Sequence, residues 1–220
     1  MAYAIAPAPG AWTAADLAER FGAIPLSRIR SNPPPGTARE EDVIEIHDRE
    51  DRLCELVDGV LVEKTVGTYE AYLAALIGRL LGNHVEGHGL GFVLGADGMM
   101  RLAPGLVRIP DVAFISWDRL PGREFPREAI WDLAPDLAVE VISKGNTAEE
   151  MDRKLQEYLA AGVREVWYVY PATRQVHVFT SAEDSVVLSE PQTLEGGDLL
   201  PGLSLPLKRL FAEPGQAAKS

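Results

Sequence analysis

The sequence predicts an α/β fold of the mixed α+β type, with a mixed central sheet flanked by helices. Residues 135–167 read as strand, helix and strand, and a succession of this length favours a parallel β-α-β crossover. Upstream, one amphipathic helix precedes two core strands, at 90–94 and 107–115, and the Glu140 strand is the third. The expected order of core elements is therefore helix, three strands, helix and strand, or αβββαβ.

The strand at residues 137–142 carries an unexpected charge. Its residues are apolar and partly β-branched except for Glu140, which is the pattern of a strand covered on both faces. Burying an unpaired carboxylate costs several kcal/mol. We therefore expect Glu140 to be paired with a base, protonated or bound to a cation.

The helix that follows this strand has clear ends. A polar turn at residues 143–146 leads to Thr147, a good N-cap, and Glu150 stands where it would complete a capping box. Gly162 has the character of a C′ glycine that ends the helix. Lys154 lies at the border of the apolar stripe, from which its ammonium could reach back toward the Glu140 strand. The stripe consists of Met151, Leu155, Tyr158 and Leu159.

The other elements complete the expected domain. Residues 53–65 predict a hairpin that turns at Asp58-Gly59, and residues 69–84 predict a helix with a wide apolar face. Strands are expected at 90–94, 99–102 and 107–115, and a C-terminal hairpin at 165–180. We expect an N-terminal extension at 1–39 with a short helix and a proline-rich linker, one domain at 40–211, and a flexible tail at 212–220.

Composition limits the classes of function. With 46% hydrophobic and 25% charged residues, the 220-residue chain is typical of a globular protein. Cys54 is the single cysteine, which excludes an internal disulfide and a cysteine-cluster zinc site. No apolar run approaches the roughly 18 residues of a membrane span, and no secretory signal is evident, so a cytoplasmic protein is expected. The net charge of −12 argues against tight non-specific binding to DNA.

Four charged residues stand where regular elements would otherwise be apolar: Glu70, Asp111, Glu140 and Lys154. Carboxylates on adjacent strands could hold Mg²⁺ or Mn²⁺, with the backbone carbonyl of Val141 or Ile142 as a further oxygen ligand. Lys154 could then orient a water molecule or stabilise a developing anion. The alternative is a buried network of ion pairs in which Arg101 or Arg108 satisfies the acids.

Residues 50–180 contain three motifs that resemble those of a known protein family. An E-V-I-S turn, a K-x₃-Y helix and a G-V-x-E-V-W segment share seven positions with the Uma-two family of endonuclease-like proteins, in the restriction-endonuclease-like PD-(D/E)XK superfamily. Pro110-Asp111 is similar to the superfamily's PD motif. The seven positions are Glu140, Ser143, Lys154, Tyr158, Gly162, Val163 and Trp167.

The resemblance implies a restriction-endonuclease-like fold and a Mg²⁺-dependent endonuclease that hydrolyses DNA phosphodiester bonds, with a homodimer as its assembly. It implies that Asp111 and Glu140 are catalytic metal ligands, joined by the backbone carbonyl of Ile142. Glu70 would be the helix acid and Lys154 the catalytic lysine.

The sequence departs from the superfamily pattern at one position. An E-x-K motif would place lysine two residues after Glu140, where this chain has Ile142. The lysine function would then fall to Lys154 or to Lys144 in the polar turn. An alternative function is that of a non-catalytic interaction protein, which keeps the fold and binds a basic partner through its acidic surface.

Overall fold

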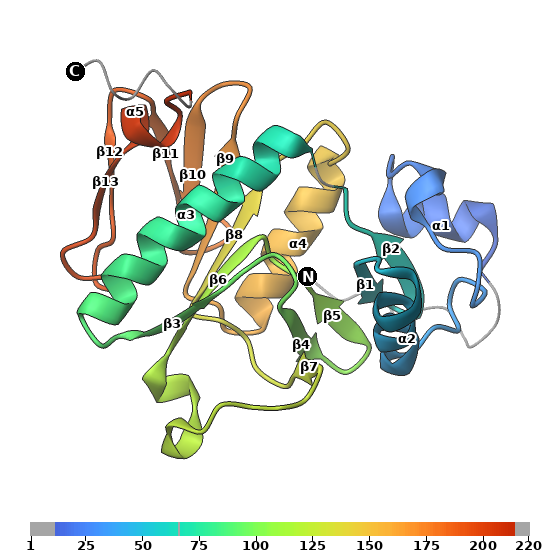
Figure 1. The fold of residues 1–220 in the computed structure, drawn as a ribbon. Helices are drawn as coiled ribbons and strands as arrows, with labels where there is room; N and C mark the ends of the chain where they lie inside the picture. The colour runs from blue at the N-terminus through green and yellow to red at the C-terminus, as the bar shows by residue number, and fades with distance from the viewer. Residues whose placement is uncertain (1–11, 66, 214–220) are drawn as a thin grey trace.

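The centre of the molecule is a six-stranded mixed sheet (Figure 1), seen in a computed structural model that describes residues 12–65 and 67–213. Its strand order is β11-β10-β9-β8-β6-β3, with β8 and β9 parallel and the other pairs antiparallel. The strands are β3 (Gly91–Leu94), β6 (Val112–Ser116), β8 (Leu137–Val141), β9 (Glu165–Tyr170), β10 (Gln175–Phe179) and β11 (Ser185–Ser189).

Two helices cover the two faces of this sheet. Helix α3 (Thr68–Gly87) packs on the face that carries Leu137 and Val139, and α4 (Ala148–Ala160) packs on the face that carries Ala138. The alternation follows from the two-residue period of strand side chains. With α4 as the crossover between parallel β8 and β9, the expected αβββαβ order is confirmed.

The ends of α4 follow the expectation in part. The Thr147 hydroxyl accepts a hydrogen bond from the Glu150 N–H at 3.2 Å, and Gly162 has a φ of 86°. The expected capping box is wrong, because the Glu150 carboxylate binds Arg28 instead of returning to the helix start.

A second sheet of five strands lies beside the first, with the order β2-β1-β5-β4-β7. The expected hairpin is confirmed as β1 (Cys54–Val57) and β2 (Val60–Glu63), with positive φ at both Asp58 and Gly59 as a type I′ turn requires. The sheet is completed by β4 (Met99–Ala103), β5 (Leu106–Arg108) and β7 (Ile130–Trp131).

The single strand expected at 107–115 is wrong, since the structure has two strands in two sheets. Residues 106–108 form β5 in the five-stranded sheet, and residues 112–116 form β6 in the central sheet. Pro110 has no N–H to donate to a strand ladder, which explains the break. The break places Asp111 where the chain crosses from one sheet to the other.

The remaining elements surround the five-stranded sheet and the far edge of the central one. The short helix expected in the N-terminal extension is α1 (Ala14–Phe21), which Thr13 caps and which packs with Val57, Val60 and Val62 of the hairpin. Helix α2 (Glu40–Glu50) packs on β1 through Val43 and Ile46, although its sequence indicates only a charged, solvated segment. The others are η1 (Leu26–Arg28), η2 (Trp117–Arg119), η3 (Pro121–Arg123), β12 (Thr193–Glu195), β13 (Ser204–Pro206) and α5 (Leu207–Leu210).

The flexible tail expected at 212–220 falls largely outside the described residues, as do positions 1–11 of the N-terminal extension. Within the described part of the chain, no helix combines the length and the apolar character that crossing a membrane requires.

Candidate active site

Strand register brings Asp111 and Glu140 together. Val112 of β6 pairs with Val139 of antiparallel β8, so one step further along the ladder Asp111 stands opposite Glu140. The Asp111 N–H donates to the Val139 carbonyl at 3.0 Å, and its carboxylate accepts the Val141 N–H at 2.8 Å. The Asp111 side chain therefore takes the place of the next ladder bond, at the joined ends of the two strands.

Glu140 lies on the α4 side of β8 and is only 4% exposed. Its Oε1 accepts hydrogen bonds from the Tyr158 hydroxyl at 2.7 Å and from the Lys154 ammonium at 3.1 Å. Burial raises the pKa of Glu140 and the Asp111 charge raises it further, against the opposing effect of Lys154. Of the two lysines considered for the site, the structure brings Lys154 to Glu140, whereas Lys144 is exposed in the turn.

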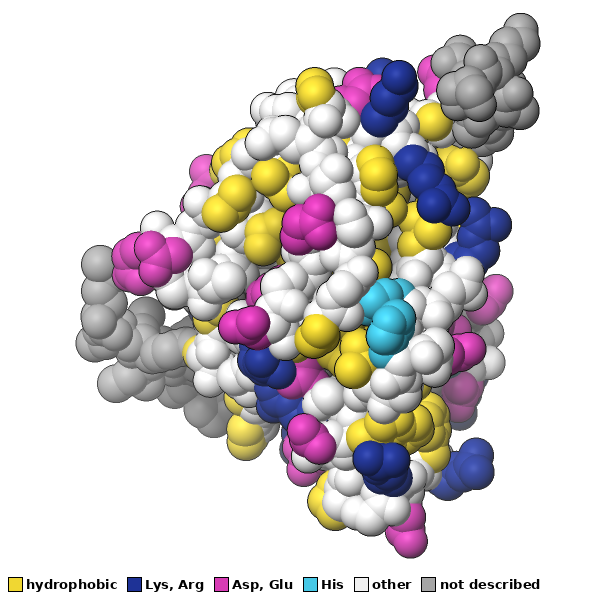
Figure 2. Space-filling view, turned by 90° about the vertical axis from the view of Figure 1, so that its left-hand side faces the viewer, with side chains coloured by type: hydrophobic (Ala, Val, Ile, Leu, Met, Phe, Trp, Pro, Cys, Tyr) yellow, Lys and Arg dark blue, Asp and Glu magenta, His cyan; other side chains and the backbone are white. Residues whose placement is uncertain are grey.

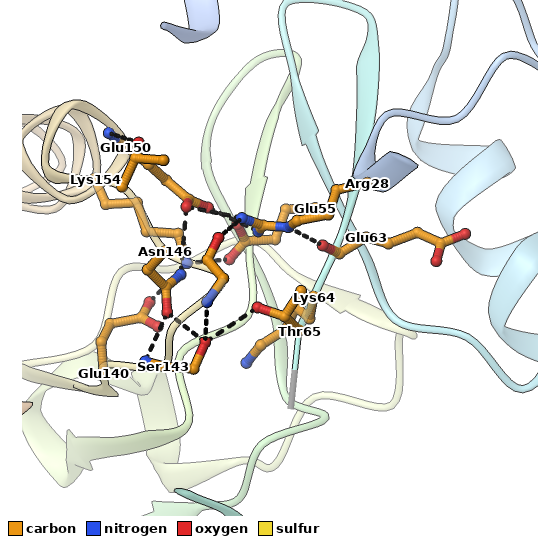
Figure 3. A network of polar contacts seen from close by, with 12 residues as sticks. Arg28, Glu55, Glu63, Lys64, Thr65, Glu140, Ser143, Asn146, Glu150 and Lys154 are labelled. Atoms are coloured by element: carbon orange, nitrogen blue, oxygen red, sulfur yellow. Dashed lines mark hydrogen bonds and ion pairs between the residues drawn. The ribbon is translucent and has the colours of Figure 1, made fainter. Parts of the chain in front are cut away.

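Lys154 also binds a third acid, Glu55 of β1, at 3.0 Å (Figure 3). Burial alone would lower the pKa of Lys154, but the Glu140 and Glu55 carboxylates raise it above its ordinary value. Lys154 is therefore a fixed cation at neutral pH. It can stabilise negative charge or orient a water molecule, but it cannot accept a proton.

Asp111, Glu140 and Glu55 are each paired with a base, as in the buried ion-pair network that was the alternative to a metal site. Neither Arg101 nor Arg108, the partners expected there, binds Asp111 or Glu140 in the described structure. Arg108 binds Glu55 at 2.6 Å and also contacts Glu157, while Arg101 binds Glu40 away from the site. Asp111 instead pairs with Lys64, whose Nζ lies 2.9 Å from Oδ1.

A cavity of about 360 Å³ opens beside Asp111, between α3 and the turn that joins β3 to β4. Glu70 lines the same cavity, but its carboxylate folds back over Gly67, where a Cβ would lie 2.0 Å from Glu70 Oε2. The helix wall is built from small residues that leave the space open. They are Ala71, Ala74, Ala75 and Gly78.

Asp111 lines this cavity, whereas Glu140 is not among the lining residues and points to α4, where Lys154 and Tyr158 bind it. Both acids fit a hard divalent cation in kind. Asp111 and Glu140 offer carboxylate oxygens, which Mg²⁺ and Mn²⁺ prefer. The Val141 N–H points to Asp111, whereas the Ile142 N–H donates to Val169 on β9. Because the N–H and C=O of one strand residue point to the same side, strand geometry favours the Val141 carbonyl over that of Ile142 as the third oxygen. Among the described residues, no three His, Cys, Asp or Glu side chains are grouped to hold a metal ion.

Comparisons with known proteins identify the family of this chain. Residues 40–208 match the model of the Uma2 family, which is described as "Putative restriction endonuclease". The chain belongs to this family. No curated protein is a significant match.

A solved structure has the same fold as this Uma2 protein. It comes from Anabaena variabilis and is described as a "putative nuclease belonging to DUF820". The two chains are 17% identical with a TM-score of 0.65, and the match covers 73% of this chain and 90% of the other. The restriction-endonuclease-like fold expected from the sequence is confirmed.

One residue outside the Uma2 match reaches the site. The Arg28 guanidinium, which precedes the matched region, binds Glu150 at 2.8 and 2.9 Å and the carbonyls of Gly145 and Glu63 at 2.9 and 3.0 Å (Figure 3). It therefore ties the end of β2 to the polar turn and the first turn of α4.

Three of these site residues were missed from the sequence: Arg28, Glu55 and Lys64. Glu55 carries a signal, because it interrupts the buried run of β1 as Glu140 interrupts β8. Lys64 follows a strand end and Arg28 lies in a short 3₁₀ turn, and neither position has a local pattern that indicates a role.

Proposed function

We propose that this protein is a divalent-metal-dependent nuclease that hydrolyses DNA phosphodiester bonds at the cavity beside Asp111. The observation that carries the proposal is the meeting of Asp111 and Glu140 at the joined ends of β6 and β8, with Lys154 3.1 Å from Glu140. Family membership and the shared fold support the reaction class.

In this proposal Asp111, Glu140 and the Val141 carbonyl would hold Mg²⁺ or Mn²⁺, since the Ile142 N–H and therefore its carbonyl point to β9. Such an ion lowers the pKa of a bound water and neutralises charge on a phosphate. Lys154 keeps its proton and supplies a fixed positive charge next to Glu140. Glu70 would assist from the cavity wall by accepting a hydrogen bond from water.

The distribution of charged side chains on the surface affects how DNA would be bound. On the face shown in Figure 2, Lys and Arg side chains lie among Asp and Glu and form no continuous strip in the part of the chain described. With a net charge of −12, affinity would depend on the metal and on local contacts more than on a basic groove. A homodimer in the cytoplasm would bring two such sites to one duplex.

The test is cleavage of duplex, single-stranded and branched DNA with Mg²⁺ or Mn²⁺, compared with a chelator control. Asp111→Asn, Glu140→Gln and Lys154→Met should each abolish cleavage while the protein stays folded. Lys144→Met is the matched control, because it removes an exposed lysine of the neighbouring turn. Cleavage that survives in purified Asp111→Asn would rule out this site, and loss in Lys144→Met alone would move the lysine function there.

A second candidate is a non-catalytic interaction protein with the same fold. It is favoured by the pairing of Asp111 with Lys64, and of Glu140 and Glu55 with Lys154, which gives each carboxylate a basic partner. The acidic surface would then meet a basic protein. DNA-independent capture of a stable protein partner, together with no cleavage under any metal, would favour this candidate.

A further inference from the structure

Lys64 is buried, although a lysine at the end of a strand is usually exposed to solvent. It directly follows β2, yet its side chain is only 7% exposed and points into the junction of the two sheets. Its ammonium donates to Asp111 Oδ1 at 2.9 Å and to the backbone carbonyl of Ile109. A buried ammonium thus binds one carboxylate oxygen and one carbonyl oxygen.

This pair of oxygens is the kind of donor set that a hard divalent cation uses. Lys64 therefore occupies a cation position next to the acid that we propose as a metal ligand. An ammonium and a divalent ion that both bind Asp111 Oδ1 repel each other and compete for the negative charge of one carboxylate, so each weakens the binding of the other.

The local charges show why Lys64 matters for this acid. Lys154 is already divided between Glu55 and Glu140, and Arg108 between Glu55 and Glu157. In the described structure the basic partner of Asp111 is Lys64. Without it, Asp111 and Glu140 would carry negative charge that a divalent ion could neutralise.

We infer that Lys64 is a built-in competitor for the divalent cation at Asp111, so that metal entry displaces its ammonium and the lysine sets the metal affinity. The inference rests on the proposed function only in assuming that the site takes a metal. Its test needs no nucleic acid, so its failure and the failure of DNA cleavage can be told apart.

The first measurement is calorimetric titration of Mn²⁺ into the metal-free protein and into Lys64→Met. We expect binding to be at least about ten-fold tighter in the variant, equivalent to 1.4 kcal/mol. Lys144→Met is the matched control, since it makes the same change in net charge on an exposed turn and should bind as the parent does. Lys64→Met combined with Asp111→Asn should lose the gain.

The second measurement uses the unmodified protein, in case Lys64→Met does not fold. Acylation of lysines, followed by mass spectrometry, should be faster at Lys64 when Mn²⁺ is saturating, while Lys154 stays protected. Equal or weaker Mn²⁺ binding in folded Lys64→Met, or unchanged labelling of Lys64 at saturating or the highest attainable Mn²⁺, would overturn the inference. Tighter binding without any DNA cleavage would leave it standing and remove the nuclease proposal instead.

Discussion

Replacing Arg28 with alanine should destabilise the protein far more than replacing a surface arginine. The guanidinium makes two hydrogen bonds to Glu150 and two to backbone carbonyls, all between 2.8 and 3.0 Å. The Arg28 side chain is 7% exposed and that of Glu150 is 1% exposed, so solvent cannot replace these bonds without rearrangement.

The expected loss follows from what the substitution leaves behind. Removing one partner of a buried ion pair costs about 3–5 kcal/mol, because the remaining charge stays buried without its counterion. Asn146 alone would still donate to Glu150, at 3.3 Å. For a chain of this size each kcal/mol corresponds to about 2–4 °C in the melting temperature. Arg28→Ala should therefore melt roughly 6–20 °C below the parent.

Arg49→Ala is the matched control. Arg49 pairs with Glu45 on the outer side of α2, where the two side chains are 75% and 52% exposed. Exposed pairs contribute at most about 1 kcal/mol. Thermal and urea unfolding of both variants, with Glu150→Ala and the double variant Arg28→Ala/Glu150→Ala, would give the coupling energy. Two results would contradict this expectation. One is that Arg28→Ala lowers the free energy of unfolding no more than Arg49→Ala does. The other is that the loss in the double variant equals the sum of the losses in Arg28→Ala and Glu150→Ala.

Three further outcomes are expected. Burial raises the pKa of the Cys54 thiol to about 11, so a thiol reagent at pH 8 should label it only in denaturant, and fast labelling of the folded protein would contradict its position in β1. Burial acts to raise the pKa of Glu150, but its arginine partner lowers it overall, so the folded state binds fewer protons than the unfolded state. The resulting stability is present above the ordinary value of 4.5 and lost as the pH falls below it, and Glu150→Gln should flatten the dependence of unfolding free energy on pH between about 5 and 3. Gly59→Ala should lose clearly more than about 1 kcal/mol in urea unfolding, because φ is +75° and a Cβ would lie 2.6 Å from the Gly36 carbonyl. Gly105→Ala has the same φ with open space around it, so an equal loss there would show that the contact with Gly36 is unimportant.

The elements that could be predicted from sequence are those specified locally. The α3 and α4 helices follow from apolar periodicity, and the hairpin from the Asp58-Gly59 turn. Glu140 stands out because a charged residue interrupts a buried strand, which is a signal contained within five residues. The same signal is present at Glu55, which interrupts the buried run of β1.

What could not be predicted depends on contacts between distant segments. Helix α2 has only two buried apolar side chains, and its packing on β1 decides its structure. Glu150 has the spacing of a capping-box acid, but a charge-assisted pair with Arg28, 122 residues earlier, is stronger than the return bond to the helix start. No local pattern contains such information.

The division of residues 107–115 explains why the site has more members than the αβββαβ core supplies. Since Pro110 ends one ladder and Asp111 begins the next, Asp111 lies at the junction of the two sheets. At this junction the hairpin of the second sheet brings Lys64 to Asp111 and Glu55 to Lys154. The hairpin is therefore part of the proposed active centre, and Lys64 at its end is in direct contact with the proposed metal ligand Asp111. A substitution that disturbs the contact between the two sheets should accordingly change the affinity of Asp111 for a cation more than it changes the stability of the central sheet.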